Sequence, residues 1–174
     1  MRVVAGAYKG RTLHAPRGQR TRPTADRVRE AVFSMLGPVD GLRVLDLFAG
    51  SGALGIEALS RGADAAVFVE RDPRAVAAIR RNLEPLGVET EVVRRDALAY
   101  LRDPPEAPFD LVFADPPYDA AVHLAGPLGE ALATVVSEGA RIVTESDKRN
   151  PLELTLPLLR ERTYGDTRIT VHRA

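Results

Sequence analysis

Three glycines, Gly50, Gly52 and Gly55, have the G-x-G-x-x-G spacing found in many nucleotide-binding turns. A short apolar run precedes them and a stretch with helical periodicity follows, which places them between a strand and a helix. Glycine is needed there because the backbone turns sharply and a ligand approaches where a Cβ atom would clash. Glu70 ends the next apolar run, 20 residues after Gly50, where a carboxylate can accept ribose hydroxyl groups. This pattern predicts a site for a dinucleotide or for S-adenosylmethionine.

Three further acidic residues favour S-adenosylmethionine. Asp46 lies four residues before the first glycine, where its charge suits a sulfonium and an ammonium group and opposes a pyrophosphate. Asp96 ends the third apolar run and could accept the adenine amino group, and Asp115 ends the fourth. The predicted cofactor-binding residues are Asp46, Phe48, Ala49, Gly50, Ser51, Gly52, Glu70, Arg71, Asp96, Ala97 and Asp115.

The tetrad Asp115-Pro116-Pro117-Tyr118 fits methyl transfer to the amino group of a nucleobase. The Asp115 carboxylate and the Pro116 carbonyl would accept the two N–H bonds and stabilise the positive charge that develops on nitrogen. Tyr118 would stack on a base that is unpaired or flipped out. In isolation these four residues could equally form a simple turn. Their place after the fourth apolar run favours a catalytic role for all four.

The basic residues are concentrated at the N-terminus, although the whole chain has a formal net charge of zero. Residues 1–29 hold eight of the 24 Lys and Arg residues and one of the 24 Asp and Glu residues, so they carry +7 and the rest carries −7. Such asymmetry is typical of an arm that contacts RNA or DNA, although a solvated arm without a partner has the same composition.

Several classes of site and of protein are excluded or disfavoured. The chain has no cysteine, which excludes disulfides, thiolate metal sites and Cys nucleophiles. His14, His123 and His172 lack metal-ligand spacing, so we expect no metal. Its 174 residues fit one domain, and neither a membrane-spanning run nor an export signal is visible. We therefore expect a cytoplasmic monomer without an obligate protein partner.

The elements that must position these residues alternate along the chain. Predicted strands cover residues 44–48, 65–69, 89–93, 111–114 and 140–144, and predicted helices cover 53–60, 73–86, 97–102 and 121–136. Two last strands, 158–164 and 167–172, flank Gly165-Asp166 and predict a hairpin. The fold class is therefore α/β, with a Rossmann-like, mostly parallel sheet, an antiparallel C-terminal hairpin and helices on both faces.

The N-terminal segment is predicted to form a separate small unit. Residues 3–5 and 11–13 read as a short hairpin around a turn at residues 6–10. Thr24 would cap a helix over residues 25–36, so the predicted division is a basic arm, 1–24, and a methyltransferase domain, 25–174. Glu57, Glu84 and Glu130 are expected on the solvated faces of helices.

Over nearly its whole length the chain resembles the RsmD-type 16S ribosomal RNA guanine-N2 methyltransferases. The resemblance implies methylation of a guanine amino group in small-subunit ribosomal RNA, with the arm gripping the RNA. It places Arg22-Pro23-Thr24 near the cofactor pocket, and Asp115 agrees with the guanine-directed relatives, since many others have Asn there. The matching stretches are 6–11, 22–30, 45–55, 115–118 and 164–167. The expected RNA-binding residues are Lys9, Arg11, Arg20, Arg22, Thr24 and Arg27.

Other functions share parts of this pattern. An adenine amino-methyltransferase acting on DNA would use the same tetrad, but the chain shows no second domain to read a DNA sequence. A glutamine-directed protein methyltransferase would have no use for the basic arm. A nonenzymatic RNA-binding module is a further alternative, which the intact glycines and Asp115 disfavour. A nicotinamide oxidoreductase is another, and a change in NADH fluorescence on mixing would test for it.

Overall fold

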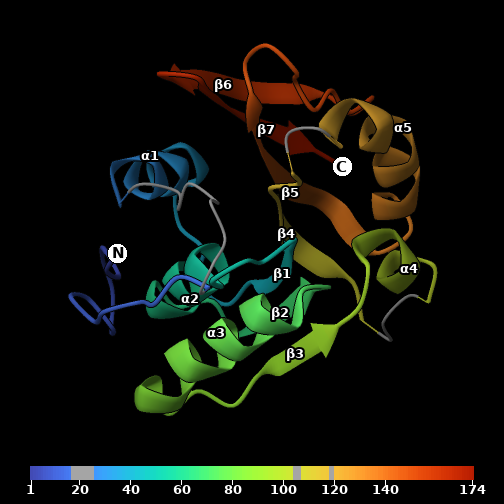
Figure 1. The fold of residues 1–174 in the computed structure, drawn as a ribbon. Coiled ribbons are helices and arrows are strands. Elements are labelled where there is room, and N and C mark those ends of the chain that lie inside the picture. The colour runs from blue at the N-terminus through green and yellow to red at the C-terminus, as the bar shows by residue number, and fades with distance from the viewer. Residues whose placement is uncertain (17–25, 104–106, 118–119) are drawn as a thin grey trace.

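The computed structural model describes residues 1–16, 26–103, 107–117 and 120–174. These residues form a seven-stranded sheet in the order β3-β2-β1-β4-β5-β7-β6 (Figure 1). Strands β1 to β5 are parallel, whereas β7 runs antiparallel to both β5 and β6. The predicted sheet with an antiparallel C-terminal hairpin is confirmed. The strands are β1 (Arg43–Leu47), β2 (Ala65–Glu70), β3 (Glu91–Arg94), β4 (Phe109–Ala114), β5 (Val136–Asp147), β6 (Leu158–Tyr164) and β7 (Thr167–Arg173).

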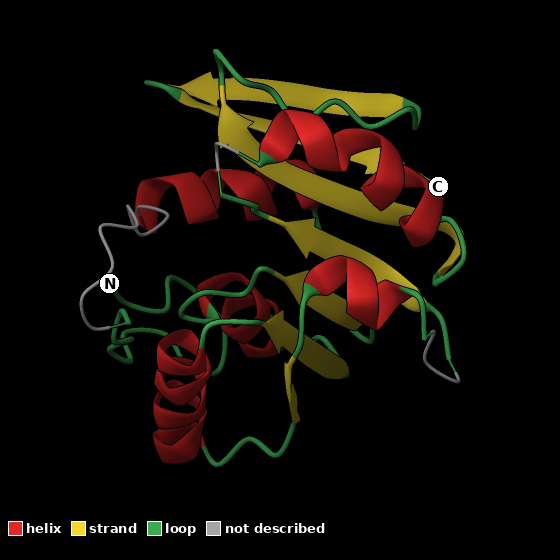
Figure 2. Cartoon of the chain, turned by 45° about the vertical axis from the view of Figure 1, so that its right-hand side comes forward, coloured by secondary structure: helices red, strands yellow, loops and turns green. Residues whose placement is uncertain are grey.

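Helices cover both faces of the sheet, as predicted (Figure 2). One apolar core contains Phe33, Ile56 and Ile79 from three helices, and a second core on the opposite face contains Leu101 and Leu128 from two others. Parallel strands need this double cover because a crossover helix returns the chain to the same edge of the sheet. The helices are α1 (Asp26–Leu36), α2 (Ala53–Ser60), α3 (Pro73–Leu83), α4 (Ala97–Leu101) and α5 (Ala121–Leu132), with a 3₁₀ turn, η1 (Glu84–Leu86).

Three predicted elements have clearly different bounds in the structure. The helix expected over 73–86 ends at Leu83, because Pro85 lacks an amide donor and Gly87 then takes a left-handed φ of 64°. The helix expected over 121–136 ends at Leu132, and the strand expected over 140–144 extends over Val136–Asp147. Antiparallel pairing with β7 accounts for the extension at the far end, where Asp147 pairs with Thr167.

The N-terminal arm is packed against the domain. The predicted turn is present, but the two flanking strands are reduced to a single antiparallel bridge between Arg2 and Thr12. The amides of Val4 and Ala5 donate instead to the carboxylate of Glu57, at 2.8 and 2.9 Å. Val3 and Leu13 belong to the same core as α1 and α2. The proposed domain boundary between residues 24 and 25 lies outside the described residues.

Candidate cofactor and catalytic site

The predicted site residues gather at the carboxyl edge of the parallel sheet. Strand β1 lies between β2 and β4, so successive crossovers leave β1 in opposite directions. Such a switch point is where α/β sheets bind ligands. Phe48 follows the last residue of β1, Glu70 is the last residue of β2, and Asp115 follows the last residue of β4. Predicted cofactor and catalytic residues therefore share one edge of the sheet.

The glycine loop between β1 and α2 contains three residues with left-handed backbone. Phe48, Gly50 and Gly52 have φ values of 57°, 55° and 75°, and Phe48 is the one non-glycine residue with positive φ among those described. The Gly52 amide closes the turn by donating to the Ala49 carbonyl at 2.6 Å. A strained aromatic residue in such a loop is typical of a functional site.

The first and last of the motif glycines meet different physical demands. A Cβ atom at Gly50 would have only the Phe48 carbonyl within 4 Å, so the space beside this backbone is open to a ligand. At Gly55 a Cβ atom would lie 2.4 Å from the Phe68 ring, so this glycine allows α2 to pack on β2. The first glycine therefore leaves room for a ligand and the last one serves helix packing.

Asp46 and Glu70 hold this loop in place. The Asp46 carboxylate accepts the Gly55 amide at 2.9 Å, and the two oxygens of Glu70 accept the amides of Gly50 and Asp72, each at 2.9 Å. A carboxylate offers about four lone-pair positions, so Glu70 retains acceptors for ribose hydroxyls. Both residues thus shape the loop in addition to the ligand contacts that the sequence predicts for them.

Asp115 lies beside another acid that the sequence analysis missed. Ala114 of β4 pairs with Thr144 of β5, so the residues that follow, Asp115 and Glu145, are neighbours. Desolvation by burial, then the charges of Glu145 and Asp46, raise the pKa of the Asp115 carboxyl well above its ordinary value. Burial raises the pKa of Asp46 to about 8, against the effect of the Gly55 amide and with a contribution from Glu70. This acid cluster, Asp46, Asp115 and Glu145, would be stabilised by a cationic ligand.

Asn82 is a second residue that the sequence analysis missed. Its buried side chain accepts the His14 amide at 2.8 Å and donates to the carbonyls of His14 and Ser51, at 3.0 and 2.9 Å. One amide group therefore joins α3, the N-terminal arm and the glycine loop. Only the tertiary structure reveals this role, since an Asn near the end of a helix is common in sequences.

The remaining predicted cofactor residues occupy three places. Phe48, Ala49 and Ser51 lie in the glycine loop, and Arg71 is exposed just after β2. Asp96 caps α4 by accepting the Ala99 amide at 3.1 Å, and its exposed carboxylate keeps acceptors for adenine. Ala97 is buried as the first residue of α4.

The tetrad predicted to be catalytic follows β4 directly. Pro116 is buried and Pro117 is exposed, whereas Tyr118 lies outside the described residues. No backbone amide of the described chain donates to the Pro116 carbonyl, while the Pro117 carbonyl accepts the Ala120 amide at 2.9 Å. Pro116 thus offers an acceptor beside the Asp115 carboxylate.

The predicted RNA-binding residues that the structure describes are on the surface. Lys9, Arg11 and Arg27 are exposed. The other three, Arg20, Arg22 and Thr24, fall in the segment 17–25 that is not described. One basic residue counted with the arm, Arg29, is fully buried and bonds Asp26 and the Arg2 carbonyl, so it does not face a partner.

The expectation that Glu57 faces solvent is wrong. Its side chain is fully buried and its carboxylate accepts the Val4 and Ala5 amides. Arg61 lies 2.8 Å away and Arg29 lies 3.8 Å away. The arm folds over α2 and covers this residue, which helical periodicity alone does not reveal. Glu84 and Glu130 are exposed, as predicted.

Two kinds of feature are absent from the described ranges. No group of three His, Cys, Asp or Glu side chains there could hold a metal ion. Among the helices that the structure describes, none is long and apolar enough to cross a membrane.

Comparison with known proteins assigns the chain to a family. A family model described as conserved hypothetical protein 95 matches residues 1–173. The Escherichia coli K12 protein named ribosomal RNA small subunit methyltransferase D is 38% identical over 176 residues, which cover 95% of this chain and 85% of that protein. This chain belongs to the RsmD family.

Two other proteins show how far the likeness to the RsmD family extends. The Bacillus subtilis protein YlbH, which has a provisional rRNA methyltransferase name, is 41% identical over 187 residues, covering 99% of this chain and 98% of YlbH. The solved structure of Escherichia coli yhhF is 33% identical and has a TM-score of 0.85, with 99% of this chain and 97% of that chain covered. Both likenesses include the N-terminal arm as well as the sheet.

Proposed function

We propose that this protein transfers a methyl group from S-adenosylmethionine to the exocyclic N2 amino group of a guanine in 16S ribosomal RNA. The observation that supports this proposal most is the position of Asp115, which directly follows β4 and belongs to the acid cluster beside the glycine loop. The name of the Escherichia coli relative, a small-subunit ribosomal RNA methyltransferase, supports the same RNA class.

The chain has the groups that this cofactor needs. S-adenosylmethionine supplies an electrophilic methyl group on a positively charged sulfur. The acid cluster fits positive charge, because Asp46 and Asp115 form no ion pair with any described residue and the charge of Asp46 raises the pKa of Asp115. The open side of Gly50 admits a ligand, and Glu70 and Asp96 retain acceptors for ribose and adenine.

Asp115 and Pro116 would hold the guanine amino group during the reaction. The amino lone pair is delocalised into the ring, so the nitrogen must become more tetrahedral and gain positive charge before it can be methylated. Two acceptors, the Asp115 carboxylate and the Pro116 carbonyl, would orient both N–H bonds and stabilise that charge. The base must leave its stack to reach them, and stacking on Tyr118 remains a prediction.

The arm and the first turn of α1 would supply part of the RNA affinity. Lys9, Arg11 and Arg27 are exposed and suited to neutralise phosphates. Arg20, Arg22 and Thr24 are proposed for the same surface on sequence grounds. The proposed reaction takes place in the cytoplasm on ribosomal RNA or on the small subunit, and the enzyme acts as a single chain.

The test is to incubate the protein with radiolabelled S-adenosylmethionine and undermethylated small-subunit particles, digest the RNA and identify the labelled nucleoside. The expected product is N2-methylguanosine. Label in no RNA nucleoside, or label in a methylated adenosine, would contradict the proposal. Parallel incubations with DNA and with ribosomal protein test the two rival methyltransferase functions.

A further inference from the structure

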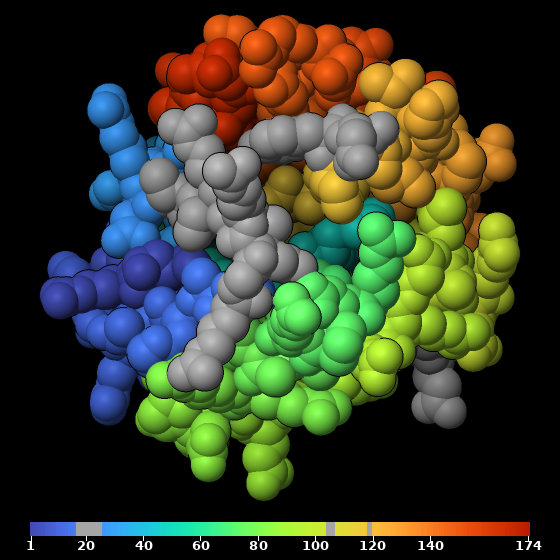
Figure 3. All heavy atoms as spheres, viewed as in Figure 1, coloured from blue at the N-terminus to red at the C-terminus, as the bar shows by residue number. Residues whose placement is uncertain are grey.

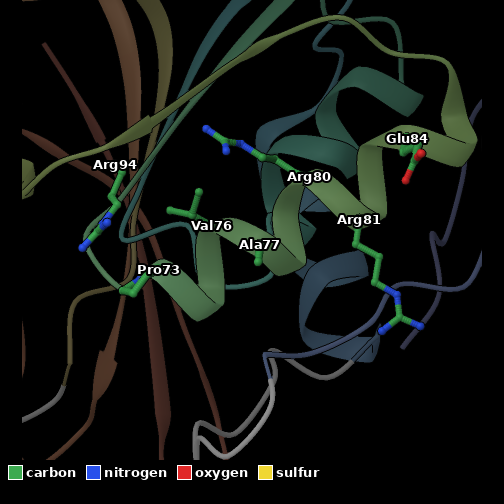
Figure 4. Close-up of a pocket in the computed structure, with 7 residues that line it drawn as sticks. All are labelled: Pro73, Val76, Ala77, Arg80, Arg81, Glu84 and Arg94. Carbon is green, nitrogen blue, oxygen red and sulfur yellow. The ribbon is translucent and has the colours of Figure 1, made fainter.

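We propose that a groove along α3 and the end of β3 binds the phosphate backbone of the RNA, beyond the contacts assigned to the arm. The groove has a volume of about 600 Å³, and its charged lining consists of Arg80 and Arg81 from α3, Glu84 from η1 and Arg94 from β3 (Figure 4). This proposal rests on the proposed function, since it adds contacts for the same RNA substrate.

The three guanidinium groups are available to a ligand. Arg80, Arg81 and Arg94 are exposed, and none of them forms an ion pair or a side-chain hydrogen bond with a described residue. In contrast, the neighbouring Arg95 pairs with Asp103 at 3.1 Å. Figure 4 shows Arg94 beside Pro73 at one end of the groove and Glu84, the one acid in the lining, at the other. Phosphate is the ligand chemistry that such a set of free arginines favours.

The groove connects the arm with the cofactor edge. At one end Arg94 pairs in the sheet with Glu70, whose carboxylate holds the Gly50 amide. At the other end Asn82 of α3 bonds both backbone groups of His14. The space-filling view shows α3 at the surface next to the blue N-terminal residues (Figure 3). An RNA strand that runs from the arm to the methyl-transfer site would therefore pass along this groove.

The apolar part of the lining indicates backbone binding without base recognition. Pro73, Val76 and Ala77 form it, and none of the lining residues is aromatic. Base recognition in single strands uses aromatic stacking platforms, whereas free arginines along a helix track phosphates. The exposed Arg71 and Arg74 lie at the Pro73 end and extend the same positive surface.

The test compares two double variants in RNA binding. Arg80→Gln with Arg81→Gln removes two groove charges. The matched control, Arg102→Gln with Arg162→Gln, removes two exposed arginines, one just after α4 and one in β6, which also form no ion pair with described residues. Binding to small-subunit RNA is measured over a series of salt concentrations. The groove variant is expected to bind roughly tenfold or more weakly and to lose about 1.4 to 1.8 from the slope of log K against log salt. Arg94→Gln is expected to lose about half as much of that slope.

The outcomes separate this proposal from the proposed function. S-adenosylmethionine affinity is measured for each variant and is expected to equal that of the wild type, which also shows that the variants are folded. Wild-type affinity and slope in the groove variant, or an equal loss in the control, would overturn the groove proposal while guanine methylation by the wild type stands. If RNA binding is lost in the groove variant alone and the wild type forms no methylguanosine, the groove proposal stands and the proposed function is refuted.

Discussion

Two buried carboxylates lie at α2 and differ in their partners: Glu57 belongs to the helix, and Asp46 accepts an amide of its first turn. Glu57 accepts two backbone amides from the arm and lies near the guanidinium groups of Arg61 and Arg29. Asp46 accepts one amide, from Gly55, and its electrostatic neighbours Glu70 and Asp115 are also acids. Positive charge therefore surrounds the first site, and negative charge accumulates at the second.

The different partners of these two sites indicate different roles, one in the fold and one in ligand binding. A buried charge that has its own cations and donors is compensated within the fold, and removing one partner leaves the other buried without compensation, which is strongly destabilising. Burial and neighbouring acids raise the pKa of Asp46 and Asp115, and such shifts are costly for folding and common at functional sites. Glu57 thus anchors the arm, whereas the acid cluster is best explained by a cationic ligand.

The largest expected effect is at the first site. Glu57→Ala leaves the buried Arg29 without one of its acidic neighbours and removes the acceptor of two arm amides. The free energy of unfolding should fall by about 3–5 kcal/mol, measured by urea denaturation. Glu130→Ala, which removes an exposed acid of α5, is the matched control and should change it by less than about 0.5 kcal/mol. Equal losses in both variants would mean that Glu57 does not anchor the arm.

Asp115→Ala should affect the reaction more than the fold. Removing a preorganised acceptor from the reacting nitrogen should lower kcat about 10²- to 10³-fold, measured as N2-methylguanosine formed per enzyme. Affinity for S-adenosylmethionine should change far less, because Asp46 and Glu145 still provide negative charge. Asp115→Asn, which retains an oxygen acceptor, should keep more activity than the Ala variant. Unchanged turnover in both would remove Asp115 from the proposed mechanism.

Asp46→Asn should weaken cofactor binding roughly 10- to 100-fold, as expected for the loss of one charged partner. The same substitution should favour the folded state relative to the wild type as pH rises, although it weakens cofactor binding. Because the pKa of Asp46 rises from 3.8 to about 8 on folding, its ionisation costs free energy of folding progressively as pH rises between these values. The Asn variant should therefore lose less stability than the wild type over this range, measured by thermal unfolding at several pH values. A steeper loss in the variant would contradict the raised pKa.

The sequence predicts the elements that depend on local signals. The helix over 53–60 and the strand over 158–164 have the predicted bounds, because the glycine turn and the Gly165-Asp166 turn mark them within a few residues. Strand ends also place Glu70, Asp96 and Asp115 correctly at one edge of the sheet. The helix expected to continue to Val136 fails because pairing of Phe109 with Val136 draws that residue into the sheet.

The partners of buried polar residues could not be predicted in the same way. Glu57 lies 52 and 53 residues from the arm amides that it accepts, so helical periodicity assigns it to the wrong face. Glu145 lies in a strand, and only its register with β4 shows that it adjoins Asp115. Asn82 joins segments 68 and 31 residues away. These contacts depend on tertiary packing, and a single sequence contains no local signal for them.

The most direct test of the acid cluster is calorimetric titration with S-adenosylmethionine at about pH 6 and about pH 8, in buffers of different ionisation enthalpy. A cation lowers the pKa of Asp46 and Asp115, so binding should release protons and should be tighter near pH 8. S-adenosylhomocysteine, which lacks the sulfonium charge, should show a smaller pH dependence. Equal affinity at both pH values with no proton release would contradict the conclusion that these acids bind a cationic cofactor.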